Sequence, residues 1–561
     1  MLEMVKQRQH EARDRANWQT CQTLLNCYIR EVANENSDRC EIDSRTGVFK
    51  ISFAASEISL SGQMRFSPMG EHDYLSIRVS SGEPLTSAEL ARWIVKEVRS
   101  GFDGITDEME SDFVRRVANS CSNIALFVAE RGVVPVDNYL ASEQSLLFGH
   151  PFHPYPKNTI GFEADDVKRF APELRASFQL CYLAVHKEAF HEEWLPSADR
   201  IGPHPSVLAH AREMLGEAAG DYRLLPVHPW QYEHIHSVQA IKERMEEGVI
   251  VPLGSCGPMA YPTSSVRTVY VPDMKCNVKL PLDIQITNLK RNNTREQMRR
   301  TMDAAFYLQQ AGCFEQEPHI FAASEEGVLG CRLGDEAVES LLTVAFRPVH
   351  YDPASTYVLA SLVETPAGEG PSRLSCIMAS SQVETWVRRY LDLSLLPIVR
   401  TAEEKGIHFE AHLQNSLLTV RNGMPDTFLI RDLEGVSVER DHALSGWDTS
   451  GPLFYSREQA RARTTYYFMV NHLGSLLHAI ARDMGAEETS LWAIVREKLE
   501  QELASSGNDY ARFLLTTDVF RAKRNLASCL AGRGETPSFA DVRNPMTIRE
   551  SERIEDDRQY V

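Results

Sequence analysis

The chain has 561 residues, of which 43% are hydrophobic and 24% are charged, as in ordinary globular proteins. At roughly 150 residues per domain, this length predicts about three or four core-forming units. The formal net charge of −19 argues against a general nucleic-acid-binding protein, because contacts to phosphates need a basic surface. It leaves room for a small anionic ligand in a locally basic pocket.

The 11 cysteines are scattered and form no CxxC pair, so we expect reduced thiols rather than a zinc ribbon or a redox motif. The charged N-terminus lacks the apolar core of a signal peptide, and no apolar run approaches the ~20 residues of a membrane span. The cytoplasm is therefore the expected location.

Residues 1–145 are predicted to form an α+β lobe. The spacing of apolar residues indicates a helix, then a group of strands, then a second helical stretch, at about 5–35, 47–80 and 86–135.

Residues 146–350 begin with an irregular loop rich in proline and histidine. Two helical stretches near 167–190 and 205–217 and a strand-rich block from 222 to 350 are expected to follow. The remaining region, 351–561, is predicted to contain a long helix, a hairpin and two further helices, at about 377–404, 407–437, 457–485 and 489–505.

The predicted hairpin carries the most informative pattern. Residues 406–415 alternate between polar and apolar side chains, which predicts a strand. One face of that strand would carry His408, Glu410, His412 and Gln414. An Asn-Gly turn follows at 422–423 and would bring Asp432 back beside Gln414 and Asn415.

Carboxylate and amide oxygens are the ligands that Mg²⁺ prefers, and Mg²⁺ commonly takes one or two carboxylates plus nucleotide phosphates. Glu410 and Asp432 fit that pattern. A solvated hairpin face beside an Arg431–Asp432 ion pair is an open alternative, and so is a zinc site of His408, Glu410 and His412.

A second predicted hairpin supplies positive charge. Its strands, 261–271 and 274–280, fold about Pro272-Asp273 and place Arg267 near Lys279, with Ser265 on the face of Arg267. Together with Arg291 these groups could clamp phosphates or carboxylates. A basic surface ribbon is the alternative interpretation.

A third stretch, His150-Pro-Phe-His-Pro-Tyr-Pro-Lys157, holds three prolines that stiffen the loop. It would hold His150, His153 and Lys157 in fixed relative positions, which suits contacts to a nucleotide. A turn whose imidazoles cap backbone groups is equally compatible. No P-loop, GxSxG, HExxH or GxGxxG pattern is present.

Four blocks, GHPFHPYPK, SSVRT with Lys279 and ITNLKR after it, FEAHLQN, and RDLEG, occur in this order between about 149 and 435. In these motifs the chain resembles the NRPS-independent siderophore synthetases, the IucA/IucC-like family that includes the aerobactin synthetases. The wording of FEAHLQN and RDLEG is closer to the free-citrate (type A) group, such as the achromobactin and staphyloferrin B synthetases.

The resemblance implies an α+β, cupped-hand architecture with mixed and antiparallel sheets and helices around a central cleft. The thumb, fingers and palm would be 1–145, 146–350 and 351–561. It also implies roles for individual residues. ATP would contact His153, Ser265, Arg267, Thr268 and Lys279. Citrate would contact Thr287, Arg291, His412 and Gln414. Mg²⁺ would be held by Glu410, Asn415 and Asp432.

Arg291, His412 and Lys279 would be catalytic, and Lys523 would reach the site from the C-terminal region. The implied activity is ATP-dependent adenylation of a citrate carboxylate followed by condensation with an amine or alcohol. A homodimer is expected because dimerisation is common in the family. The alternatives are the same chemistry on 2-oxoglutarate or on a citrate monoamide or ester, a non-catalytic citrate- or siderophore-binding protein, and a metal-dependent hydrolase.

Overall fold

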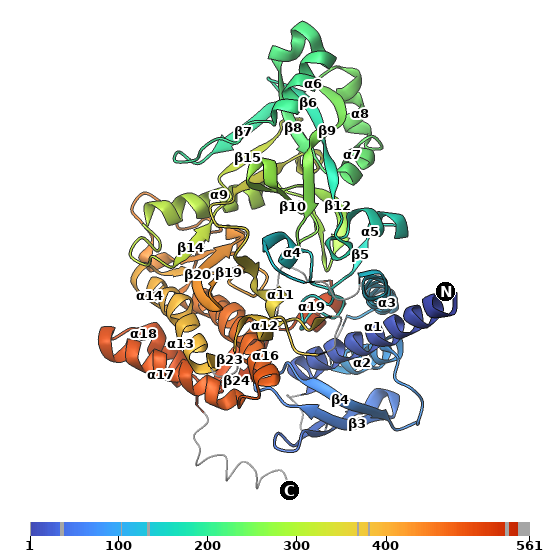
Figure 1. Cartoon of the computed structure of the whole chain (residues 1–561), viewed down its shortest axis with the longest axis vertical. Helices are drawn as coiled ribbons and strands as arrows, with labels where there is room; N and C mark the ends of the chain where they lie inside the picture. Colours follow the sequence, from blue (N-terminus) through green and yellow to red (C-terminus); the bar gives the residue numbers. More distant parts are fainter. Residues whose placement is uncertain are drawn as a thin grey trace.

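The protein is described by a computed structural model that covers residues 2–33, 39–101, 104–131, 135–366, 370–379, 382–532 and 538–547. Its elements form three groups, with the N-terminal group at the bottom and the middle group at the top of Figure 1. No helix of the described residues is long and apolar enough to cross a membrane. All 11 cysteines are free.

The N-terminal group packs three helices against an antiparallel meander of four strands, in the order β1-β2-β3-β4. Alternate residues of β2 are buried, so one face of the sheet packs on the helices and the other faces solvent. The elements are α1 (Leu2–Glu31), β1 (Cys40–Ile42), β2 (Val48–Phe53), β3 (Ile58–Arg65), β4 (Asp73–Val79), α2 (Ser87–Gly101) and α3 (Asp107–Arg131).

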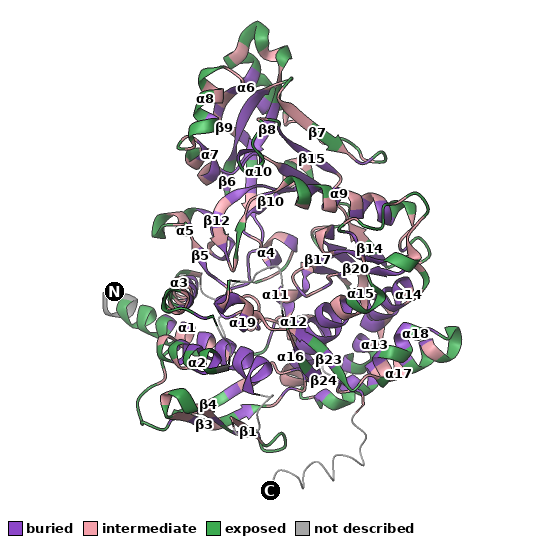
Figure 2. Cartoon of the chain, turned by 180° about the vertical axis from the view of Figure 1, so that it is seen from behind, coloured by how far each residue is buried: buried purple, intermediate pink, exposed green. Residues whose placement is uncertain are grey.

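The middle group is built on an antiparallel sheet of eight strands, in the order β7-β15-β16-β11-β10-β9-β6-β8. Figure 2 shows buried residues along β8 and β9 and exposed residues on the helices at the tip. The strands are β6 (Phe178–His186), β7 (Phe190–Trp194), β8 (Tyr222–Val227), β9 (Ile250–Pro262), β10 (Thr268–Val271), β11 (Cys276–Lys279), β15 (Gly327–Cys331) and β16 (Val344–Pro348).

Smaller elements complete this group. A three-stranded sheet in the order β13-β12-β5 lies beneath the large one. Its strands are β5 (Thr159–Ile160), β12 (Leu282–Ile286) and β13 (Leu289–Arg291). The helices are α4 (Tyr139–Glu143), α5 (Ala164–Phe170), α6 (Pro205–Leu215), α7 (Pro229–Ile235), α8 (Gln239–Glu246) and α10 (Glu336–Ser340).

The last group surrounds a four-stranded sheet in the order β14-β20-β19-β17, in which only the β14–β20 pair is parallel. The strands are β14 (Ile320–Ala323), β17 (Thr356–Val358), β19 (Ser416–Arg421) and β20 (Met424–Arg431). A second sheet contains β18 (Ile407–His408), β21 (Ser437–Glu439) and β22 (Phe454–Tyr455).

Helices cover this sheet and form the largest apolar core, to which α9 also contributes. They are α9 (Arg295–Gln310), α11 (Leu359–Val363), α12 (Leu374–Ile377), α13 (Val383–Leu393), α14 (Leu395–Lys405), α15 (Arg457–Thr464), the π-helix η10 (Thr465–Leu473), α16 (Gly474–Met484), α17 (Glu488–Ser506) and α18 (Asp509–Thr516).

The C-terminal end crosses back to the N-terminal group. Between the two strands of the ribbon formed by β23 (Val519–Lys523) and β24 (Phe539–Arg543), helix α19 (Asn525–Leu530) buries Leu526, Cys529 and Leu530 in the core formed by α1, α2, α3 and the meander. Figure 1 shows α19 beside α1 and α3.

Several local predictions are wrong in detail. The helix expected near 167–190 ends at Phe170, and Phe178–His186 forms strand β6. Its apolar run Leu180–Val185 is buried on both faces, and such a run has no alternation that separates a strand from a helix. The stretches near 86–135 and 377–404 each hold two helices, the second pair divided at Ser394.

Candidate active site

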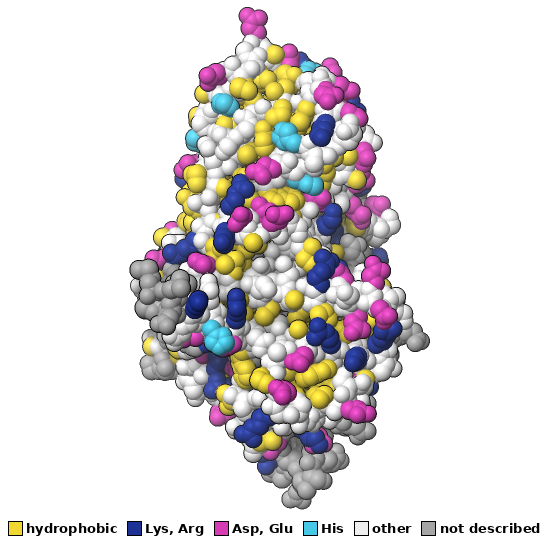
Figure 3. Space-filling model, turned by 90° about the vertical axis from the view of Figure 1, so that its right-hand side faces the viewer, with side chains coloured by type: hydrophobic (Ala, Val, Ile, Leu, Met, Phe, Trp, Pro, Cys, Tyr) yellow, Lys and Arg dark blue, Asp and Glu magenta, His cyan; other side chains and the backbone are white. Residues whose placement is uncertain are grey.

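A cavity of about 2560 Å³ lies at the centre of the molecule and is lined by residues of all three groups. Its lining includes twelve of the thirteen residues to which the sequence assigned a role in the site: Ser265, Arg267, Thr268, Lys279, Thr287, Arg291, Glu410, His412, Gln414, Asn415, Asp432 and Lys523. His153 is the exception. Acidic and basic side chains are interspersed over the face shown in Figure 3.

The cavity wall holds three residues with unusual backbone. Val266, Thr287 and Asp432 have φ values of 67°, 57° and 65°, in the left-handed region. Such a conformation is a steric outlier for the β-branched Val266 and Thr287, and strained backbone of this kind concentrates at functional sites. Three separate segments of the cavity wall therefore bear the backbone signature of a site.

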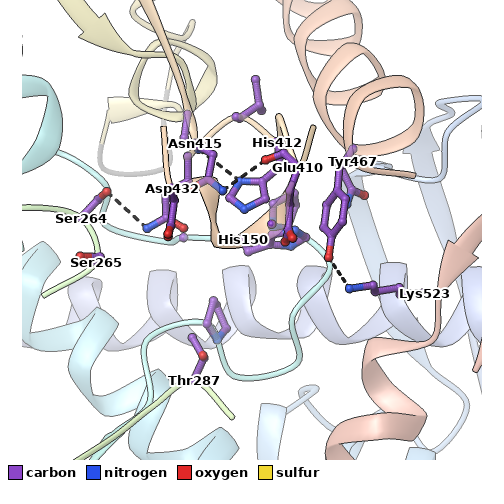
Figure 4. A pocket seen from close by; sticks show the side chains of 18 of the residues that line it. His150, Ser264, Ser265, Thr287, Glu410, His412, Asn415, Asp432, Tyr467 and Lys523 are labelled. Carbon is purple, nitrogen blue, oxygen red and sulfur yellow. Dashed lines mark hydrogen bonds between the residues drawn. The ribbon is translucent and has the colours of Figure 1, made fainter. Parts of the chain in front are cut away.

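The SSVRT segment is a tight turn rather than part of the strand predicted at 261–271, since β9 ends at Pro262 and β10 begins at Thr268. The Thr263 amide bonds to the Thr268 carbonyl at 2.8 Å, and the Thr268 amide bonds to Ser265 Oγ at 3.2 Å. The turn directs Ser264 and Ser265 into one end of the cavity, as Figure 4 shows.

Three cations converge beside this turn. Thr268 pairs with Lys279 in the β10–β11 register, so Arg267 and Lys279 are near neighbours, as predicted. Arg267 Nη1 donates to Asn293 Oδ1 at 2.6 Å, and Arg291 Nη2 donates to Thr287 Oγ1 at 2.8 Å. Burial and the nearby Arg267 lower the pKa of Arg291 to about 10, so it stays charged at neutral pH.

Cations buried this close together are unfavourable unless anions balance their charge. Carboxylates from the β20 end face the three cations. Lys279 Nζ lies 3.0 Å from Asp432 Oδ1 and 3.3 Å from Glu434 Oε2. Burial opposes the charge on Lys279, but the two carboxylates outweigh it and raise the pKa of this amine. Burial likewise opposes the charge on Asp432, yet Lys279 and Arg347 hold the pKa of that carboxyl below its usual range.

The FEAHLQN segment departs from the predicted strand. Strand β18 ends at His408 and β19 begins at Ser416, so residues 409–415 form a loop with no ladder partner. Local bonds shape this loop: the Asn415 amide donates to the His412 carbonyl at 2.9 Å, and Asn415 Nδ2 donates to the Glu410 carbonyl at 3.2 Å. Figure 4 shows Asp432, Asn415, His412 and Glu410 gathered on one wall of the cavity.

The hairpin prediction holds for the residues after this loop. Ser416 pairs with Ile430 in the β19–β20 register, and the Arg431 amide bonds to the Asn415 carbonyl at 2.9 Å. This register brings Asp432 to the level of Gln414, as the Asn-Gly turn predicted. The suggested Arg431–Asp432 ion pair does not form, because the Arg431 side chain turns to Glu143 of α4.

Glu143 and Arg431 form a buried two-point contact that supports both walls. One guanidinium nitrogen lies against Glu143 Oε1, and the other donates to Oε2 at 3.2 Å. Arg431 also donates to the Gln414 carbonyl at 2.8 Å, while Glu143 Oε2 accepts from Ser264 Oγ at 2.9 Å. Gln414 Nε2 in turn donates to Ser264 Oγ at 3.3 Å, so the two walls are held by one network.

Two neutral imidazoles face the cavity. His412 Nδ1 accepts from the Asn415 amide at 3.3 Å, and His150 Nδ1 accepts from the Phe152 amide at 3.0 Å. Burial lowers the pKa of both rings. Each ring therefore carries its proton on Nε2, where it can donate to an anion. Figure 4 shows His150 just below His412.

His153 and His408 lie outside this arrangement. His153 Nε2 is 3.7 Å from Cys529 Sγ, and its Nδ1 accepts from the Tyr155 amide at 3.3 Å. His408 is buried, with Nε2 3.1 Å from Glu439 Oε1 and Nδ1 3.1 Å from Thr464 Oγ1. The alternative zinc site of His408, Glu410 and His412 is therefore not assembled, and the described residues form no cluster of three or more His, Cys, Asp or Glu suited to a metal.

The end of the cavity opposite Ser264 and Ser265 is closed by the C-terminal part of the chain. Lys523 Nζ contacts the Tyr467 hydroxyl, and Arg463 Nη2 lies 3.3 Å from Glu410 Oε2. Burial lowers the pKa of Lys523, and Glu410 partly offsets this effect. Figure 4 shows Tyr467 and Lys523 at this end.

Several residues of the cavity were missed by the sequence interpretation. Glu434 lay within the quoted RDLEG block but received no role. Glu143, Arg463 and Tyr467 lie on helices and belong to none of the blocks, so no local pattern indicated them. His150 was noted as a member of its loop, but the sequence favoured its neighbour His153 for the site.

Comparison with known proteins adds independent information. The model of the IucA / IucC family matches residues 138–363, and a model described as ferric iron reductase FhuF-like transporter matches residues 384–538. The L-2,3-diaminopropanoate–citrate ligase of Staphylococcus aureus is 32% identical over 95% of this chain and 96% of its own length. The spermidine–citrate ligase of Bacillus anthracis is 26% identical over 96% of this chain and 99% of its own.

Solved structures share the whole fold. ATP-bound aerobactin synthetase IucA from Klebsiella pneumoniae superposes with a TM-score of 0.82 at 24% identity, over 94% of this chain and 99% of that one. The petrobactin biosynthesis protein AsbB from Bacillus anthracis gives a TM-score of 0.81 at 18% identity, over 99% of both chains. With its motifs, its fold and a relative of 32% identity along nearly its full length, the chain belongs to the IucA/IucC family of NRPS-independent siderophore synthetases.

Proposed function

We propose that the protein adenylates one carboxylate of citrate with ATP and then joins the acyl group to an amine, releasing AMP and pyrophosphate. The observation that carries this proposal is the meeting of Arg267, Lys279 and Arg291 with Asp432 and Glu434 in one cavity. ATP phosphates need cationic side chains, and the Mg²⁺ ion that accompanies them needs carboxylates within a few ångströms. This cavity supplies both.

The nucleotide is assigned to the end of the cavity formed by the SSVRT turn. Arg267 and Lys279 would neutralise phosphate charge, and the Ser265 hydroxyl and its neighbour Thr268 would contact the phosphates. His150 Nε2–H is a further donor that faces this space. The contact of His153 with ATP remains a prediction. In this structure the His153 ring lies against Cys529.

The acid is assigned to the space between Arg291 and the loop of residues 409–415. Arg291 is held against Thr287, and a guanidinium in this position can grip a carboxylate at two points. His412 Nε2–H and the Gln414 amide would hold the remaining oxygens from the opposite wall. These contacts would leave one carboxylate directed at the α-phosphorus of the nucleotide.

The donor set also fits Mg²⁺, which prefers oxygen ligands and keeps some of its sites for phosphate and water. Asp432 Oδ1 contacts Lys279, but the side chain is 41% exposed toward the cavity and keeps lone pairs free. Glu410, Asn415 and Asp432 would hold the ion. The ion would neutralise the charge on the phosphate oxygens during transfer.

The proposed reaction proceeds in two steps, adenylation and condensation. A citrate carboxylate oxygen attacks the α-phosphorus of ATP, the bond to the bridging oxygen breaks, and pyrophosphate leaves. Lys279 and Arg267 stabilise the negative charge that shifts onto that leaving group. The amine nitrogen then attacks the acyl carbon of the citryl adenylate, AMP departs with the bonding electron pair, and the nitrogen loses one proton.

Citrate and an amine are the substrates named for several relatives, including the ligases from Staphylococcus aureus and Bacillus anthracis. The test is pyrophosphate release by the purified protein with ATP, Mg²⁺ and citrate, using hydroxylamine to trap the adenylate. L-2,3-Diaminopropanoate, spermidine and N6-acetyl-N6-hydroxylysine then replace hydroxylamine one at a time, and mass spectrometry identifies the product.

We expect citrate-dependent pyrophosphate release and one preferred amine. 2-Oxoglutarate and a citrate monoamide serve as competing acids in parallel reactions. Binding of citrate without pyrophosphate release under any of these conditions would instead support a carrier, and ester hydrolysis without ATP would support a hydrolase.

A further inference from the structure

The π-helix Thr465–Leu473 lies behind the loop that carries Glu410 and His412. All nine of its residues are buried. Its hydrogen bonds join residues five apart, so side chains at that spacing lie above one another on one face. In an α-helix of 3.6 residues per turn, the same two side chains would point about 140° apart. The wider turn therefore lets Tyr467 and His472 face the same loop.

Tyr467 and His472 both contact the loop of residues 409–415. The ring centroids of Tyr467 and His412 are 5.9 Å apart, and the Tyr467 hydroxyl contacts Lys523 Nζ. His472 Nδ1 lies 2.7 Å from the carbonyl oxygen of Ala411. Stretches of π-helix inside α-helices are frequent at functional sites, and this one sits between α15 and α16.

The hydrogen bonds of His472 fix its tautomer. A carbonyl oxygen can only accept, so Nδ1 carries the proton and donates it to Ala411. Nε2 then has a lone pair, which accepts from the hydroxyl of Tyr390 on α13. Burial lowers the pKa of His472 to about 3, so the ring stays neutral and both bonds persist at physiological pH.

The Ala411 carbonyl belongs to the peptide that joins Ala411 to His412, and Glu410 lies on its other side. Residues 409–415 lack strand partners, so their orientation depends on individual bonds. The end of the loop is held from outside, since Arg431 donates to the carbonyls of Asn415 and Gln414 and the Ala360 amide donates to the Leu413 carbonyl. At the Ala411–His412 peptide, the carbonyl accepts from His472, 61 residues away in sequence, and from the nearby Ser416 hydroxyl.

We propose that His472 is a positioning residue for acid binding: its Nδ1–H bond to Ala411 sets the peptide that aims His412 and Glu410 into the cavity, and Tyr390 keeps His472 in the tautomer that can donate. This inference rests on the proposed function, because its measured consequence is the handling of the acid substrate. His472 itself lies outside the cavity lining.

The experiment compares His472→Leu with His472→Asn in the full-length protein. Leucine removes the donor while keeping an apolar volume, whereas the asparagine Nδ2–H can reach the place of Nδ1–H. Pyrophosphate release is measured against citrate and against ATP separately, and ATP affinity is measured without citrate. Circular dichroism and thermal melting establish that each variant is folded.

For His472→Leu we expect kcat/KM for citrate to fall about 100-fold, as misplacement of catalytic groups by about 1 Å can cause. ATP affinity measured without citrate and without Mg²⁺ should change less than about threefold, because Ser265, Arg267, Thr268 and Lys279 lie on other elements than the loop that carries Glu410. The kcat/KM of His472→Asn for citrate should be at least about tenfold higher than that of His472→Leu. Equal losses in both variants, or a parallel loss of ATP affinity, would overturn the proposal.

Tyr390→Phe decides the matter if His472→Leu does not fold. It removes only the hydroxyl that fixes the tautomer, and we expect kcat/KM for citrate to fall about three- to tenfold with ATP affinity unchanged. Wild-type kinetics in Tyr390→Phe would overturn the proposal. Failure of the proposed function is distinguishable, since the wild-type protein would then release no pyrophosphate with citrate.

Discussion

Lys279 Nζ and Asp432 Oδ1 lie 3.0 Å apart although 153 residues separate them in the chain. Lys279 ends β11 of the eight-stranded sheet, and Asp432 follows β20 of the four-stranded sheet. The contact therefore joins two hairpins from two different sheets across the cavity. It is the meeting of acidic and cationic ribbons on which a nucleotide-activating site depends.

Lys279→Met should reduce ATP-dependent pyrophosphate release at least about 100-fold, as the loss of one electrostatic contact to a transition state commonly does. Asp432 and Glu434 would also lose their cationic partner. Initial rates with saturating citrate measure the effect. The matched control is Lys187→Met, which breaks an exposed pair with Asp221 far from the cavity and should leave the rate unchanged.

Arg291→Ala and His412→Ala should each abolish turnover and leave the fold intact. Both side chains face the cavity and support no core, so circular dichroism should be unchanged. The substitution Arg299→Ala removes an 82%-exposed arginine and serves as the control. Wild-type turnover by either cavity variant would remove its residue from the assigned site.

Glu143→Gln should lower the free energy of unfolding by about 3–5 kcal/mol, because it leaves the Arg431 guanidinium buried without a charged partner. Urea denaturation measures the change. The double variant Glu143→Gln/Arg431→Met removes both charges and should recover part of the loss. A single variant as stable as the wild type would show that water reaches and solvates Arg431.

The stability of the protein should fall at alkaline pH because of His478. Burial disfavours the charged ring, but Asp73 and Glu488, each 3.0 Å away, outweigh burial and raise its pKa to about 10. Glu71 and Arg482 also line this buried cluster. The folded state therefore holds a proton that the unfolded chain, with a histidine pKa of about 6.5, releases first.

The sign of this effect follows from proton linkage. The stabilisation is complete below about pH 6.5 and is lost as the pH rises through about 10. Urea unfolding at about pH 6, 8 and 9.5 measures the slope, and His478→Gln should flatten it. If wild type and variant lose stability in parallel over this range, another group titrates.

The hairpins and their turns could be predicted from the sequence because register follows from local signals. The Asn-Gly turn fixes which residues of β19 and β20 lie opposite, and this register placed Asp432 beside Gln414. Arg267 and Lys279 were brought together by the same reasoning. These contacts depend on short stretches of chain, where periodicity is informative.

The loop of residues 409–415 could not be predicted in the same way. Its alternating pattern is that of a strand, but tertiary contacts from Ala360, Arg431 and His472 hold its carbonyls instead of a ladder. Likewise, the choice between His150 and His153 depends on how helix α19 packs, since Cys529 of that helix lies against His153. Contacts over hundreds of residues leave no local pattern that sequence reasoning can detect.

The docking of α19 on α1 has a consequence for how the protein folds during its synthesis. The Glu31 carboxylate accepts from the Leu526 amide at 3.0 Å. Glu31 leaves the ribosome early, but Leu526 is added 495 residues later. The strand that delivers Lys523 to the cavity immediately precedes that helix. This end of the cavity therefore cannot close until the polypeptide has been almost entirely synthesised.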